Sequence, residues 1–182
     1  ASDVYKRQGK KYAIMAAEKG NFEFAFFAGR HYEQNSNPTL ALQFYKKGAD
    51  NKNIKCIEKL ADVYKKGELN QPIDYTESVK WIRKAANFGR THAKYLLASF
   101  FEKGRGVERN YTEALRLYEQ CTSIHGSNRK IGSFYLLGLG TPKNYDKALH
   151  YLTKSYKDCG DSKSAYEIGC FYERGYIVSK DY

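Results

Sequence analysis

The chain is poor in proline and cysteine and has no long hydrophobic run. Three prolines occur in 182 residues, so little interrupts helix formation. The longest apolar stretch, Tyr12 to Ala17, is too short for a transmembrane helix, so we expect no membrane span. Four cysteines without regular spacing exclude a disulfide framework of the small secreted type. We therefore expect free thiols and a reducing, cytoplasmic setting.

Aromatic residues and positive charge are abundant by contrast. The chain carries 17 Tyr and 10 Phe, enough apolar surface to offset the entropy of folding. Lys and Arg outnumber Asp and Glu by 31 to 20, a formal net charge of +11. This charge favours acidic partners, whether proteins, lipid headgroups or nucleic acid. The basic residues are spread along the chain, which favours a solvated surface over one dedicated patch.

A first pattern recurs five times, about every 36 residues. A large apolar residue and a small residue are followed by an aromatic and then by a residue that ends a helix. We count positions from the residue four places before the large apolar one, as offset 0. Offsets 0, 4, 7 and 8 then share one side of a helix, which we name the A-type helix. The copies are Ala28-Gly29-x-x-Tyr32-x-x-Asn35, Leu60-Ala61-x-x-Tyr64-x-x-Gly67, Leu97-Ala98-x-x-Phe101-x-x-Gly104, Ile131-Gly132-x-x-Tyr135-x-x-Gly138 and Ile168-Gly169-x-x-Tyr172-x-x-Gly175.

A second pattern alternates with the first. It has small residues at offsets 0 and 7 and a bulky residue at offset 3, on what we name the B-type helix. The small residues let a neighbouring helix approach closely. The copies are Gly9/Tyr12/Ala16, Ala41/Phe44/Gly48, Ser78/Trp81/Ala85, Ala114/Leu117/Cys121 and Ala148/Tyr151/Ser155.

The ends of the expected helices agree with these patterns. Asp74 and Asn110 have the form of N-caps, with Glu three residues later. The glycines that close the A-type copies suit a left-handed C-cap, and Asn35 is the next best residue there. The prediction is ten helices that alternate from a leading B-type helix. Such pairs are too small to bury their apolar faces alone, so they should stack as an all-α solenoid in which Trp81 is buried.

These residues resemble a known family. Gly67-x-x-x-x-Pro72, Gly104-Arg105-Gly106-Val107 and Lys80-Trp81-Ile82-Arg83-Lys84-Ala85-Ala86-x-x-Gly89 are similar to Sel-1-like repeats, relatives of tetratricopeptide repeats. The resemblance implies a right-handed α-solenoid of antiparallel helix pairs and a non-enzymatic scaffold that binds a protein or peptide in its groove. It implies no cofactor. The expected array covers 1–182, with repeats 1–20 (second helix only), 21–52, 53–89, 90–126, 127–160 and 161–182 (first helix only).

Catalytic and metal-binding signals are weak. Ser127 and Lys130 form a Ser-x-x-Lys motif, which raises a remote alternative, a β-lactamase-like hydrolase of the cysteine-rich members of this family. The companion Ser-Asp-Asn and Lys-Thr-Gly boxes are missing, and Ser127 takes a core position. Cys121 and His125 share a helix face but have no second ligand pair nearby. We therefore predict no catalytic, cofactor or metal residues.

The expected partner-binding groove lies opposite the core stripe of the A-type helices, at offsets 2, 6 and 9. Core burial does not explain the aromatic residues and the leucine in this set, and exposed aromatics backed by Arg suit protein hot spots. Scattered surface aromatics are the alternative. That the face is concave is implied by the resemblance alone. The positions are Phe26, Arg30 and Glu33; Glu58, Asp62 and Lys65; Tyr95, Ser99 and Glu102; Arg129, Ser133 and Leu136; Tyr166, Cys170 and Glu173.

A second class of partner stays open at this point. Helical-pair repeats of similar period bind RNA, and the net charge is positive, so RNA or another polyanion is the alternative. Acidic residues such as Glu58 and Asp62 interrupt the groove, which makes nucleic acid the less favoured partner.

The C-terminus has the form of an interrupted repeat. Asp181-Tyr182 matches the earlier helix starts, so we expect a fragment that stops where another helix begins. Without that helix, the core stripe of the last A-type helix should be only partly covered, and the chain could associate end to end through it. The stripe residues are Ile168, Phe171 and Tyr172.

Overall fold

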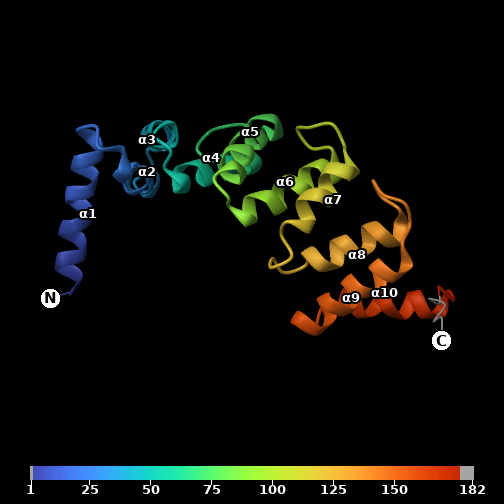
Figure 1. Ribbon diagram of the computed structural model, residues 1–182. Helices are drawn as coiled ribbons and strands as arrows, with labels where there is room; N and C mark the ends of the chain where they lie inside the picture. Colours follow the sequence, from blue (N-terminus) through green and yellow to red (C-terminus); the bar gives the residue numbers. More distant parts are fainter. Residues whose placement is uncertain (1, 177–182) are drawn as a thin grey trace. The chain divides into compact units, whose positions relative to one another are not determined.

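The computed structural model describes the backbone of residues 2–176, and the side chains from Gln8 to Tyr176 except Lys10. This part of the chain folds into ten α-helices and one short 3-10 helix, without a β-strand (Figure 1). The end at Asp181-Tyr182 lies outside the described residues. The helices are α1 (Ser2–Glu18), α2 (Ala25–Gln34), α3 (Pro38–Asp50), α4 (Ile54–Lys66), α5 (Tyr75–Asn87), α6 (Thr91–Lys103), α7 (Tyr111–Glu119), α8 (Ser127–Leu137), α9 (Tyr145–Cys159) and α10 (Ser162–Glu173), and the 3-10 helix η1 spans Phe22–Phe24.

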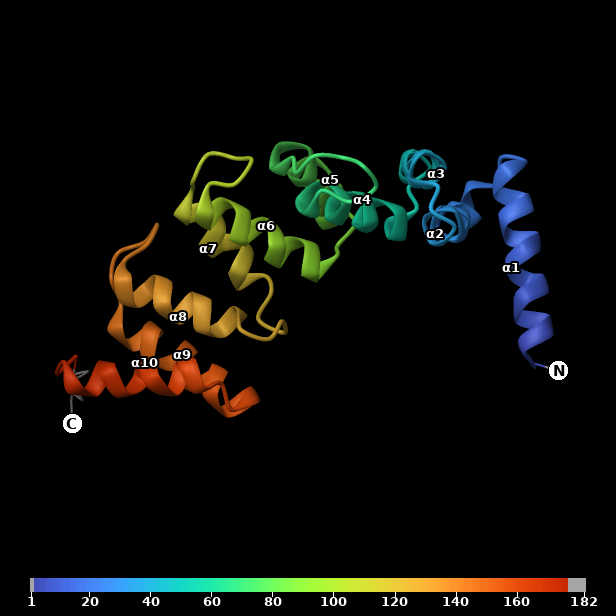
Figure 2. The same ribbon diagram turned by 180° about the vertical axis from the view of Figure 1, so that it is seen from behind.

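The alternation predicted from the sequence is confirmed. The odd-numbered helices carry the B-type pattern and the even-numbered helices the A-type pattern. Each A-type helix from α2 to α8 packs most extensively on the B-type helix that follows it. The α8–α9 pair and its neighbour α10 can be followed from both sides in Figure 1 and Figure 2. The chain is thus an all-α array of helix pairs.

The chain divides into two compact units. The first, Ala1–Phe88, holds α1 to α5, and the second, Gly89–Tyr182, holds α6 to α10. Each unit has its own buried residues at the predicted core offsets. In the first these include Leu60, Val63 and Trp81, and in the second Leu97, Ile131 and Phe134. The predicted burial of Trp81 is therefore confirmed.

The predicted N-caps are also confirmed. The side chains of Asp74 and Asn110 accept hydrogen bonds from the backbone N–H groups of Glu77 and Glu113, each at 2.9 Å. Asn144 caps α9 in the same way, although the sequence analysis did not single it out. These bonds satisfy backbone donors that the first helical turn leaves free, and so fix where the helices begin.

The predicted left-handed conformation is found at all four glycines and is wrong at Asn35; Gly175, with φ of 66°, follows Arg174 at the end of α10. Gly67, Gly104 and Gly138 adopt φ of 73°, 65° and 72° at the ends of α4, α6 and α8. Asn35 instead has φ of −95°, and the left-handed residue is Ser36, with φ of 56°. The Asn35 side chain donates a hydrogen bond to the carbonyl of His31 at 2.8 Å. The amide thereby satisfies a terminal carbonyl itself, and the turn shifts by one residue.

The core stripe of α10, formed by Ile168, Phe171 and Tyr172, contains side chains that are buried to different degrees. Tyr172 is exposed and Ile168 is half-buried, as expected, but Phe171 is buried, so the prediction of partial cover is wrong for that residue. Tyr145 and Tyr176 both lie against the Phe171 ring, with centroids 6.0 Å and 5.6 Å away. The segment after α10 folds back over Phe171, and this return was not evident from the helical pattern.

Candidate partner-binding face

The predicted groove positions share one property in all five A-type helices. At offsets 2, 6 and 9 no side chain is buried, whereas offset 4 is buried from α2 to α8. We name these fifteen positions the open face, and each unit carries its own part of this face. Side chains on it remain accessible because the B-type helices cover the opposite side.

In the first unit the open face begins on α2 with Phe26 and Arg30. Arg30 is exposed, but Phe26 is half-buried because its ring lies 6.0 Å from the ring of Tyr45 on α3. Helical periodicity alone left Phe26 outside the core, and this ring contact partly explains the residue by packing. On α4, Asp62 forms an ion pair with Lys65 at 2.5 Å, and Glu58 is half-buried.

A partly buried hydrogen-bond network holds Glu33, the third residue of the open face on α2. The Tyr45 hydroxyl donates to one carboxylate oxygen at 2.7 Å, and Lys59 Nζ donates to the other at 2.8 Å. Burial alone would raise the pKa of Glu33, but the hydrogen bonds from Lys59 and Tyr45 outweigh it and lower this pKa. Burial, followed by the bond to Glu33, raises the pKa of Tyr45. The network links α2, α3 and α4.

The second unit repeats this network with the same residue types. The Tyr118 hydroxyl and Lys130 Nζ each donate to Glu102 at 2.6 Å. Neither network is among the features predicted from the sequence. The signal was present, because each has Glu at offset 9, Tyr at offset 4 of the next B-type helix and Lys at offset 3 of the next A-type helix.

The remaining open-face residues of the second unit divide into packed and free side chains. Tyr95 is half-buried, with its ring 5.3 Å from that of Tyr118, so packing partly explains it as well. Ser99 and Leu136 are half-buried on α6 and α8. On α10, Cys170 is half-buried, whereas Tyr166 is 74% exposed, the freest aromatic of the face.

Arg129 and Ser133 are held by acidic residues. Arg129 lies 3.3 Å from Asp161 and 3.5 Å from Glu167. The Ser133 hydroxyl donates to Glu167 at 2.6 Å. Burial opposes ionisation of Asp161, but hydrogen bonds from Ser164 and Lys163, together with Arg129, lower its pKa. This part of the face is therefore a paired polar cluster with one basic and two acidic groups, rather than a free cationic site.

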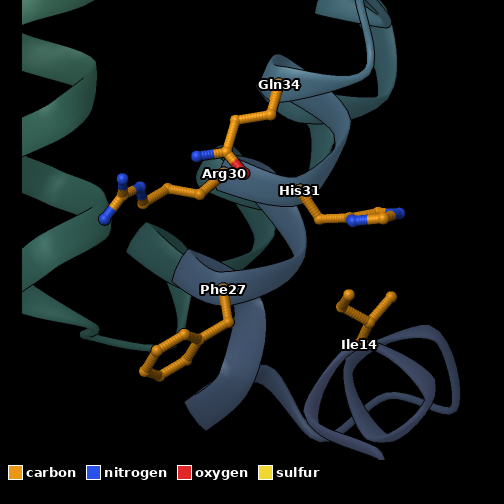
Figure 3. Close-up of a pocket in the computed structure, with 5 residues that line it drawn as sticks. All are labelled: Ile14, Phe27, Arg30, His31 and Gln34. Carbon is orange, nitrogen blue, oxygen red and sulfur yellow. The ribbon is translucent and has the colours of Figure 1, made fainter. Parts of the chain in front are cut away.

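A surface pocket lies next to the open face in the first unit (Figure 3). Phe27, Arg30, His31 and Gln34 project from α2, and Ile14 faces them from α1. The lining thus combines two apolar side chains, Ile14 and Phe27, with three polar ones. Its volume is about 140 Å³.

The two weak chemical motifs have structural roles. Ser127 is buried and its hydroxyl donates to the Tyr118 carbonyl at 2.9 Å, while Lys130 is paired with Glu102. Cys121 is buried with its thiol directed at the Thr91 carbonyl, and His125 is exposed. Within the described residues, no three potential metal ligands of the His, Cys, Asp or Glu type lie together. None of the helices described there is long and apolar enough to cross a membrane.

Solved structures with the same fold support this architecture. The chain is similar to a protective antigen of uropathogenic Escherichia coli that displays an SLR fold, with 24% identity and a TM-score of 0.78. That match covers 91% of this chain and 36% of the antigen, so the chain spans about a third of its length. It is also similar to a Sel1 repeat protein from Oxalobacter formigenes, with 24% identity and a TM-score of 0.76, over 94% of this chain and 74% of that one. At this identity the likeness shows the fold.

Family membership follows from the sequence match. The Sel1 repeat family matches six segments that together cover most of the chain: 6–21, 25–53, 54–87, 91–120, 126–158 and 162–182. Four of them contain a complete A-type and B-type pair, and the first and last correspond to α1 and α10. The chain belongs to the Sel1 repeat family.

Proposed function

We propose that the chain is a non-enzymatic scaffold that binds a peptide or protein partner along the open face. Sel1 repeat proteins are typically protein-interaction scaffolds and generally non-catalytic. The observation that carries the proposal is the accessibility of offsets 2, 6 and 9 in every A-type helix. A face that recurs with the repeat offers a partner regularly spaced contacts.

The chemistry of the open face favours a protein over nucleic acid. Glu33 and Glu102 place carboxyl groups on it that are paired with Lys59 and Lys130, and Arg129 is already paired with acidic groups. A polyanion would have to displace these pairs. Tyr166 and the half-buried Tyr95 instead offer aromatic area of the kind enriched in protein hot spots, and Leu136 adds apolar area beside them.

Site-specific crosslinking tests this proposal. A photoreactive amino acid replaces Tyr166 on the open face, and a matched chain carries it at Tyr156, a half-exposed tyrosine on the B-type helix α9. Crosslinking in extracts of the source cell should yield a discrete protein adduct from the Tyr166 position and not from Tyr156. Equal adducts from both positions would contradict binding by the open face.

A salt titration distinguishes RNA or polyanion binding from protein binding. Mobility of mixed-sequence RNA is measured with the wild-type chain at low and at physiological salt. Binding that falls by about 10³-fold or more over this range would indicate several phosphate contacts and would favour the RNA alternative. We expect weak binding with a smaller loss of affinity over this range.

A further inference from the structure

A polar cavity lies in the second unit, where consecutive turns of the array meet. It is lined by the segment that joins α7 to α8, by the first turn of α8 and by the last turn of α9. Its volume is about 250 Å³. The lining residues all lie in the interior of the array, so the cavity depends on neither terminal helix.

The side chain of Asn128 is a buried polar group in this lining. Asn128 is 5% exposed, and its amide nitrogen donates to the Thr122 carbonyl at 3.3 Å and to Asp158 Oδ2 at 3.4 Å. Because both of these neighbours are acceptors, they fix the amide with its nitrogen toward them. The Oδ1 atom of Asn128 is then buried without a donor among the described residues.

A buried acceptor without a donor is costly, and most such groups in native structures are satisfied by protein or by a bound molecule. Since Asn128 lines the cavity, a molecule bound there can supply the missing donor. A single water would satisfy Oδ1, but it would bring no charge to the carboxylate that shares the lining.

That carboxylate belongs to Asp158, in the last turn of α9. No ion pair involves it among the described residues, although Lys154 lies one turn earlier on the same helix. The last backbone carbonyls of a helix lack intrahelical donors, and the helix dipole favours a cation at this end. The cavity therefore combines an unpaired negative charge with an unpartnered neutral acceptor.

These acceptors fit an ammonium group better than a metal ion. Asn128 Oδ1, the Asp158 carboxylate and the Thr122 carbonyl are three acceptors, and a primary ammonium has three N–H donors. Calcium takes about six to eight oxygen ligands, often from several carboxylates, whereas Asp158 is the one carboxylate among the described lining residues. A guanidinium is planar and suits bidentate pairing with one carboxylate rather than three separate acceptors.

We propose that the cavity receives a lysine side chain of a protein partner. The ammonium donates to Asn128 Oδ1, to Asp158 and to the Thr122 carbonyl, while its methylene groups contact the half-buried Ile124. None of the fifteen open-face positions lines the cavity, so the ammonium site does not depend on binding by that face. That the ammonium is carried by a protein rests on the proposed scaffold function.

A titration followed by nuclear magnetic resonance tests the proposal with the isotope-labelled wild-type chain. The probes are the capped tripeptide acetyl-Ala-Lys-Ala-amide, the same peptide with norleucine in place of lysine, and n-butylammonium. The lysine peptide should shift the side-chain amide of Asn128 and the backbone amide of Gly126 in a saturable manner. The norleucine peptide, which lacks the charge, should not, and n-butylammonium should bind more weakly than the lysine peptide.

Two variants of α9 test the role of the carboxylate. Asp158→Asn should weaken binding of the lysine peptide by about tenfold or more, because a charged hydrogen bond is lost. Asp158 is exposed, so this variant should stay folded. Asp146→Asn makes the same charge change at an exposed site in the first turn of α9 and should bind like the wild type.

Three results would overturn the ammonium site. They are the absence of saturable shifts with the lysine peptide up to the highest concentration reached, equal binding of the norleucine peptide, and equal binding by Asp158→Asn. Calcium chloride that saturates the same amides and displaces the lysine peptide would identify a metal site instead. Binding of n-butylammonium as tight as that of the peptide would contradict a lysine carried by a protein. Crosslinking from Tyr166 tests the open face separately, so the two proposals can fail independently.

Discussion

At the scale of single residues, the paired donors on Glu33 and Glu102 connect successive repeats. Each carboxylate receives one bond from the tyrosine of the next B-type helix and one from the lysine of the next A-type helix. Hydrogen bonds to an ionised carboxylate are stronger than those between neutral groups. These networks therefore join three helices through one side chain.

The lowered pKa of Glu33 predicts a pH dependence of stability. A carboxyl whose folded pKa lies below its unfolded value stabilises the fold above the unfolded pKa, and this stabilisation is lost as pH falls through the folded pKa. We expect the free energy of unfolding of the wild-type chain to fall below about pH 4. Glu33→Gln should be less stable at neutral pH and should show a shallower decline, measured by urea unfolding. Glu23→Gln, at an exposed site, is the control. A slope unchanged by Glu33→Gln would contradict this role.

The four cysteines should differ in reactivity. All four are free, with Cys56 and Cys121 buried, Cys159 exposed and Cys170 half-buried. Burial raises the pKa of Cys56 to about 12 and also raises that of Cys121, so neither forms the reactive thiolate readily. Thiol titration of the folded chain should find two fast groups, and unfolding without reductant should reveal four. Two or fewer thiols after unfolding would show that disulfides form.

At the scale of helices, glycine decides how closely a pair approaches. Gly132 lies against Leu152, so the backbone of α8 closely approaches a side chain of α9. Gly169 has the same offset on α10, but a Cβ there would meet no atom of the described residues within 4 Å. The same substitution at the two sites therefore separates packing from helix propensity.

Alanine at these two glycines should have opposite effects. Gly132→Ala should destabilise the second unit by about 1–3 kcal/mol, because the new methyl group overlaps Leu152. Gly169→Ala should be neutral or stabilising by up to about 1 kcal/mol, because alanine favours the helix and meets no neighbour. Chemical unfolding at dilutions that exclude association measures both. Destabilisation by Gly169→Ala under these conditions would show that α10 is already covered.

At the scale of the whole molecule, each unit carries its own core and can respond separately to a core change. Trp81 is buried in the first unit, with Lys84 Nζ 4.2 Å from its ring centre. Its indole N–H is buried and has no acceptor among the described residues. Its contribution is therefore packing rather than hydrogen bonding. In repeat arrays, loss of one core residue weakens the local units first.

Trp81→Ala should separate the unfolding of the two units. The substitution should cost about 3–5 kcal/mol in the first unit, so circular dichroism should show an early transition followed by that of the second unit. Trp81→Phe is the matched control, since it keeps most of the packing and removes the unpaired N–H. A thermal midpoint unchanged by Trp81→Ala would contradict the burial of this side chain.

The sequence alone determined the helices, their order, the interior core positions and most helix ends. These features depend on local periodicity and on capping within a few residues, as at Asp74 and Gly67, so no distant contact is needed to predict them. The turn at Asn35 is an exception, because a side-chain amide took over the capping of its own helix end.

Only the tertiary structure decided how much of each predicted binding residue is exposed to solvent. Phe26, Tyr95 and Tyr166 all occupy offset 2. The rings of Phe26 and Tyr95 pack against tyrosines of neighbouring helices, whereas Tyr166 is largely exposed. Phe171 is buried by Tyr176, on a segment beyond its own helix. Helical periodicity fixes the side of a helix on which a residue lies. The depth of its burial depends on side chains that the fold brings from other helices and loops, and those contacts do not follow from the repeat pattern.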